Sequence, residues 1–132
     1  MPYYRLFYHF IWSTKNRQPI ITPQAEDILK KTIEIKIVGL GGRYFAVNAY
    51  RDHVHVVVSI PPSISVSRFI GQVKGVSSLK VNNAEILPEI FQWQNEYSVF
   101  TLDESRLSAC ITYVEHQKEH HMGLGKLEAC WE

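Results

Sequence analysis

The chain has 132 residues, of which 45% are hydrophobic and 20% are charged, the size and composition of a single globular domain. Its net charge of +1 argues against a protein that holds nucleic acid mainly through a broad basic surface. No apolar run is long enough to span a bilayer, and the N-terminal residues lack the pattern of a secretion signal. Two cysteines, Cys110 and Cys130, are too few for a disulfide framework. We therefore expect one cytoplasmic domain over residues 1–132 with no membrane contact.

The first half of the chain predicts a strand, a helix and a hairpin. The segment 3–12 is dense in aromatic residues, which is typical of a strand. Thr22 and Pro23 are a typical helix start, and this helix is expected to continue to about residue 38. Strands over 44–50 and 53–60 follow, joined by the short connection Arg51-Asp52.

The second half predicts a helix, a strand and a terminal helix. The first of these helices is expected to begin at Ser65 or Ser67 and to direct Arg68, Lys74 and Lys80 outward. A strand over 92–100 and a helix from about 103 to 121 complete the chain. The order β-α-β-β-α-β matches the α+β, ferredoxin-like (RRM-like) plan. That plan is a four-stranded antiparallel sheet with helices on one face. The terminal helix is an addition to it.

Two histidines lie two residues apart on the second strand of the predicted hairpin. Strand alternation places His53 and His55 on one face of the sheet, and the neighbouring valines on the other. Side chains at positions i and i+2 can converge on one metal ion, but such a pair also occurs in proteins that bind no metal. A metal site needs further ligands from elsewhere in the chain.

The terminal helix carries a second group of polar side chains. Tyr113 and Gln117 are i, i+4 neighbours at the border of its apolar stripe, and His120 follows on nearly the same side. Taken alone, Tyr113 has an ordinary explanation as the edge of an amphipathic helix. Histidines at a helix C-terminus are also explained by the helix dipole.

Taken together, these motifs resemble the single-tyrosine HUH transposases of small bacterial and archaeal insertion sequences, the TnpA type. His53-Val54-His55 matches the histidine–hydrophobe–histidine motif, and Tyr113 with Gln117 matches the tyrosine helix of that family. The segments 8–17, 74–78 and 93–100 match as well, so the resemblance covers nearly the whole chain. One departure is His116, where the family often has asparagine.

The resemblance implies a DNA transposase that cleaves and rejoins single-stranded DNA through a covalent 5′-phosphotyrosine intermediate. It makes Tyr113 the nucleophile, and His53, His55 and Gln117 the ligands of Mg²⁺ or Mn²⁺. His116 and His120 are auxiliary candidates. The implied partners are single-stranded DNA with a hairpin at the element ends and a second copy of the chain, in a homodimer whose tyrosine helix can pack against the histidine pair of either subunit, in cis or in trans.

Several basic residues are candidates for phosphate contacts, although each alone is explained as a solvated charge. They are Lys15, Arg17, Arg43, Arg68, Lys74 and Lys80. Three alternatives stay open: a non-catalytic nucleic-acid-binding module of ferredoxin-like fold, a metal hydrolase, and a host-retained relative that processes palindromic repeats. The hydrolase is disfavoured because no His-Glu-x-x-His helix is present.

Overall fold

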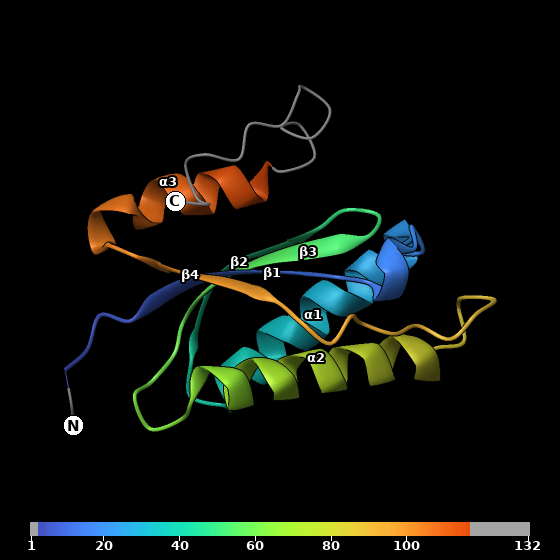
Figure 1. The fold of residues 1–132 in the computed structure, drawn as a ribbon, viewed down its shortest axis with the longest axis horizontal. Coiled ribbons are helices and arrows are strands. Elements are labelled where there is room, and N and C mark those ends of the chain that lie inside the picture. Colours follow the sequence, from blue (N-terminus) through green and yellow to red (C-terminus); the bar gives the residue numbers. More distant parts are fainter. Residues whose placement is uncertain (1–2, 117–132) are drawn as a thin grey trace.

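The structure is a computed structural model that describes residues 3–116, so Gln117 and His120 lie outside the described residues. Four antiparallel strands form one sheet in the order β2-β3-β1-β4. The elements are β1 (Phe7–Ser13), α1 (Pro23–Gly39), β2 (Arg43–Ala49), β3 (His53–Ser59), α2 (Val66–Asn83), β4 (Ser98–Leu102) and α3 (Glu104–Glu115). Helices α1 and α2 cover one face of the sheet and α3 lies over the other (Figure 1). The predicted ferredoxin-like fold with an added C-terminal helix is confirmed.

The larger core lies between the sheet and helices α1 and α2. Val54, Val56 and Val58 of β3 point into it, as the alternation along the strand predicts. The start of α1 is also as predicted: the hydroxyl of Thr22 accepts a hydrogen bond from the backbone N–H of Ala25 at 3.1 Å. Because these valines occupy the core face of β3, His53 and His55 lie on the opposite face of the sheet.

A smaller apolar cluster joins α3 to the opposite face of the sheet. Its buried members are Phe7, Ala46, Val57, Leu102, Cys110, Tyr113 and Val114.

A polar anchor from β2 supports the same attachment. The side-chain amide of Asn48 donates to the backbone carbonyls of Val114 and Glu115, at 3.0 and 3.2 Å. The last carbonyls of a helix lack the N–H partners that earlier carbonyls have, and Asn48 donates to two of these carbonyls. It ties the end of α3 to the sheet.

Two predicted strand starts were wrong. The first strand begins at Phe7 rather than residue 3, and the last begins at Ser98 rather than residue 92. Residues 92–97 do not extend β4, since only Trp93 bridges to Thr14 and the carbonyls of Gln94 and Glu96 are bonded by a side chain of α2. Helix α3 is described over Glu104–Glu115, with His116 as its C-cap at φ −114° and ψ 24°, and residues 117–121 of the predicted helix lie outside the described residues.

Candidate functional site

His53 and His55 lie on the sheet face that α3 covers. Both are buried, with 6% and 0% of their surface exposed, and their ring centroids are 5.2 Å apart. Strand β3 lies between β1 and β2, so the rings occupy the middle of the sheet rather than an edge. The prediction that the two imidazoles share one face is therefore correct.

Asp52 orients the first of these rings. Its Oδ1 lies 2.7 Å from Nδ1 of His53, and its Oδ2 lies 3.2 Å from the Arg17 guanidinium. Burial by itself raises the pKa of Asp52. The hydrogen bond and charge of His53, together with Arg17, more than offset this, and the pKa lies below its ordinary value. An ionised carboxylate only accepts, so Nδ1 of His53 carries the proton in this hydrogen bond, and Nε2 is the ring nitrogen not engaged by Asp52.

A third histidine, His9, lies against the second ring. Its Nε2 atom is 2.9 Å from Nδ1 of His55, and the two rings stack with centroids 5.1 Å apart. No role for His9 was predicted from the sequence. The available signal was the alternation along β1, which puts His9 on the face opposite to Phe10 and Trp12. Without knowledge of strand pairing, that signal does not connect residue 9 to residue 55.

Tyr113 lies beside the histidines of its own chain. Its ring centroid is 6.1 Å from that of His55, and the residue is 5% exposed. The prediction of a reachable border position is thus corrected: Tyr113 belongs to the apolar cluster beneath α3. The ring centroid of a second tyrosine, Tyr50, lies 5.8 Å from that of His53. Proximity to the histidine pair alone does not choose between the two tyrosines.

The imidazoles of His53 and His55 fit a metal ion only if a further ligand, other than a His, Cys, Asp or Glu of the described residues, completes the site. Within residues 3–116, no three His, Cys, Asp or Glu side chains are grouped as a complete metal site would be. Two neutral imidazoles therefore need a partner such as the amide oxygen of Gln117, which is outside the described residues. His120 is outside them too. The exposed His116 follows α3, and its backbone N–H donates to the carbonyls of Thr112 and Tyr113.

The predicted phosphate-contact residues do not form one group. Lys15 and Arg17 form a short 3₁₀ turn directly after β1, and Arg17 pairs with Asp52. Arg43 pairs with Ser59 at the far end of β3. At about 3.3 Å per strand residue, this is roughly 20 Å from His53. Arg68 and Lys80 are exposed on α2, on the other side of the sheet. Of these candidates, the residues of the turn after β1 lie nearest to His53, through the pairing of Arg17 with Asp52.

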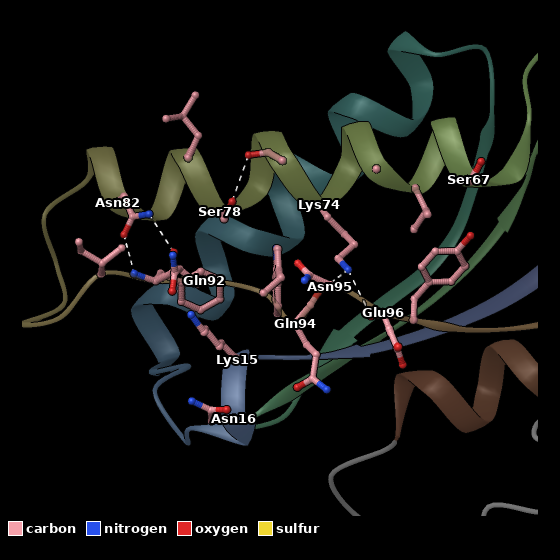
Figure 2. Close-up of a pocket in the computed structure, with 18 residues that line it drawn as sticks. Lys15, Asn16, Ser67, Lys74, Ser78, Asn82, Gln92, Gln94, Asn95 and Glu96 are labelled. Atoms are coloured by element: carbon pink, nitrogen blue, oxygen red, sulfur yellow. Dashed lines mark hydrogen bonds between the residues drawn. The ribbon is translucent and has the colours of Figure 1, made fainter.

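The prediction that Lys74 points outward was wrong. Lys74 is 9% exposed, and its ammonium donates to the carbonyls of Gln94 at 2.7 Å and Glu96 at 3.2 Å (Figure 2). Burial lowers its pKa. Lys74 thus fixes the segment before β4 against α2. We therefore no longer consider Lys74 a phosphate-contact candidate, because its ammonium is already hydrogen-bonded to two carbonyls of this segment.

A groove of about 1040 Å³ lies along the same contact, between α2 and residues 90–97 (Figure 2). Gly71, Gly75 and Ser78 line it on the helix, and amide side chains such as Asn95 line it opposite. The histidines and Tyr113 are not among its lining residues, so the groove is separate from the histidine–tyrosine site.

The family described as IS200-like transposase matches residues 2–117 of the chain. The chain therefore belongs to the IS200-like transposase family, as the histidine and tyrosine motifs predicted. It is 25% identical over 123 residues to the ISDra2 transposase TnpA of Deinococcus radiodurans, which covers 88% of this chain and 86% of that protein. It is 30% identical over 127 residues to the transposase for insertion sequence element IS200 of Salmonella typhimurium, with 85% and 76% covered.

Solved structures share the fold. A crystal structure from Deinococcus radiodurans R1, described as that of a transposase, superposes with a TM-score of 0.70 at 25% identity and covers 89% of this chain and 95% of that one. A REP-associated tyrosine transposase bound to a REP hairpin superposes with a TM-score of 0.65 at 15% identity, covering 92% and 74%. Among the described residues, no helix has the length and apolar character needed to cross a membrane.

Proposed function

We propose that this transposase cleaves and rejoins single-stranded DNA, with Tyr113 as the nucleophile and a divalent cation as cofactor. The observation that carries the proposal is the position of Tyr113, whose ring lies 6.1 Å from that of His55 on the face that presents both histidines. The tyrosine-helix motif supports the same assignment, because Tyr113 is followed four residues later by Gln117, whereas Tyr50 is followed four residues later by Val54. The expected DNA is single-stranded with a hairpin at each element end.

The ligands of the cation would be His53, His55 and Gln117. Asp52 already directs the proton of His53 to Nδ1, which leaves Nε2 as the ligating atom of that ring. When bound between these neutral ligands, Mg²⁺ or Mn²⁺ would polarise the scissile phosphate and offset its negative charge.

The covalent step exchanges one phosphate ester for another. The Tyr113 oxygen forms a bond to phosphorus while the bond from phosphorus to the 3′-oxygen breaks. The phenol proton passes to solvent, and the 3′-oxygen takes a proton and leaves as a hydroxyl. The 5′-phosphate of the DNA stays on the tyrosine. Because the ester is conserved, a 3′-hydroxyl of another strand can displace Tyr113 without ATP.

The burial of Tyr113 adds a requirement to this step. A side chain that is 5% exposed does not meet a phosphate until α3 moves relative to the sheet. The attachment of α3 includes the apolar cluster, the anchor at Asn48 and an exposed ion pair between Arg5 and Glu104 at 3.2 Å, and Asp103 links the helix to β4. We therefore propose that α3 lifts as DNA enters and that, in a homodimer, it exchanges between subunits to form composite sites in trans.

The test is formation of a covalent adduct on single-stranded oligonucleotides tiled across the genomic sequence that flanks the coding sequence. The oligonucleotides carry a 3′ label, because the retained fragment is the one with the 5′-phosphate. The wild-type protein with Mg²⁺ or Mn²⁺ is expected to form an adduct that resists denaturation. Tyr113→Phe is expected to form none, although it binds the same oligonucleotide.

Tyr50→Phe is the matched control, since Tyr50 is the other tyrosine near the histidine pair. This variant is expected to keep the adduct. His53→Ala and His55→Ala are expected to lose it. An adduct that persists in Tyr113→Phe would overturn the assignment of the nucleophile. Binding of the oligonucleotides without any adduct in the wild-type protein would favour the non-catalytic binding module instead.

A further inference from the structure

His9 is a buried histidine that the proposed reaction does not use directly. It lies on β1 opposite Val57, while the neighbouring Ile11 lies opposite His55, so His9 and His55 are diagonal neighbours on one sheet face. His9 is 0% exposed, and its Nε2 atom is 2.9 Å from Nδ1 of His55. The ring of Phe100 packs near it, with centroids 6.4 Å apart. Its orientation is therefore fixed by packing.

A hydrogen bond between two imidazole nitrogens has one donor and one acceptor, which leaves two assignments for this pair. If His9 donates, Nδ1 of His55 accepts and the proton of a neutral His55 is on Nε2, where it blocks ligation. If His9 accepts, His55 carries its proton on Nδ1, and its Nε2 presents a lone pair. Only the second assignment allows His55 to ligate through Nε2.

We propose that His9 is a positioning residue that accepts a hydrogen bond from Nδ1–H of His55. It fixes the tautomer and ring plane in which Nε2 of His55 binds the cation. The inference rests on the proposed metal site and names the group that prepares its second ligand. His9 does for His55 what the Asp52 carboxylate does for His53, where Oδ1 lies 2.7 Å from Nδ1.

The chemistry of the two acceptors differs for a physical reason. Asp52 retains some exposure and is paired with Arg17, which together stabilise its negative charge. His9 is fully buried beside an aromatic ring, where an unpaired carboxylate would lose its hydration. An imidazole supplies an acceptor at that position without a charge. It also avoids placing a second anion next to the site that receives a phosphate.

The first experiment reads the tautomer in the metal-free protein by two-bond ¹H–¹⁵N correlation spectra of the histidine rings, at a pH at which the rings are neutral. Wild-type His55 is expected to carry its proton on Nδ1. His9→Leu removes the acceptor while filling a similar volume, and its His55 is expected to shift towards the Nε2–H form. His9→Gln restores an acceptor through its side-chain carbonyl and should return the wild-type pattern.

The second experiment measures Mn²⁺ binding by titration. Removal of such an outer partner typically weakens metal affinity by about 10–100-fold, and we expect a loss in this range for His9→Leu. His9→Gln is expected to recover most of the affinity. Phe7→Leu, on the same face of β1 but paired opposite Ser59, controls for loss of packing and should bind Mn²⁺ like the wild type.

The outcomes separate this inference from the proposed function. If Mn²⁺ does not bind the wild-type protein, or binds it equally well after His53 and His55 are replaced, the proposed metal site is overturned. The tautomer spectra would still decide the direction of the hydrogen bond from His55. A wild-type His55 with its proton on Nε2, or unchanged Mn²⁺ affinity in His9→Leu, would overturn the role of His9 while leaving the metal site intact.

Discussion

Replacement of Asn48 tests how α3 is attached to the sheet. Asn48→Ala removes the two hydrogen bonds from the side-chain amide to the carbonyls of Val114 and Glu115, at 3.0 and 3.2 Å. Each such bond contributes about 0.5–1.5 kcal/mol, so we expect the free energy of unfolding to fall by about 2 kcal/mol. For a chain of this length, the corresponding decrease in Tm is about 6–10 °C. The measurement is urea denaturation, supported by hydrogen exchange of the α3 amides.

Two further variants make this test specific. Asn48→Asp keeps the acceptor for the backbone N–H of Ala49 but turns a carboxylate oxygen towards the helix carbonyls, so it is expected to be at least as destabilising as the alanine variant. Asn83→Ala, at an exposed position at the end of α2, should change stability by no more than about 0.5 kcal/mol. If Asn48→Ala were as stable as Asn83→Ala, with unchanged exchange in α3, the proposed anchor would be refuted.

Three other substitutions have defined outcomes. Lys74→Met should lower the free energy of unfolding by about 1–2 kcal/mol, because the buried Lys74 ammonium bonds two loop carbonyls, whereas the exposed Lys80→Met should be neutral in the same urea titration. Gly42→Ala places its Cβ 2.9 Å from the Ser59 carbonyl oxygen, so thermal unfolding should show a loss of about 1–3 kcal/mol, and an unchanged Tm would contradict this. The folded-state pKa of Asp52 lies below its unfolded value, so its carboxylate stabilises the fold above about pH 4 and loses that effect as the pH falls through the folded pKa. The stability difference between wild type and Asp52→Asn should therefore shrink in acid, and a pH-independent difference would argue against the ion-paired carboxylate.

The sequence predicted the features that depend on local patterns. Alternation along a strand is a property of neighbouring residues, so the shared face of His53 and His55 could be predicted without knowledge of the fold. The start of α1 was predictable for the same reason, because the hydroxyl of Thr22 bonds an N–H only three residues away.

Features that depend on distant partners could not be predicted in this way. Lys74 was expected to be a solvated charge, and its inward direction follows from carbonyls that lie 20 and 22 residues later in the chain. The link between His9 and His55 spans 46 residues and requires the pairing of β1 with β3. The burial of Tyr113 likewise depends on where α3 docks, which the periodicity of the helix does not specify.

The most direct test of the proposed chemistry is to identify the residue that carries the DNA. The adduct formed by the wild-type protein on single-stranded DNA with Mg²⁺ or Mn²⁺ would be digested with protease and nuclease, and the modified peptide would be sequenced by mass spectrometry. We predict a nucleotide attached through its 5′-phosphate to Tyr113. A nucleotide on any other residue would contradict the account. The foremost alternative is Tyr50, whose ring centroid lies 5.8 Å from that of His53.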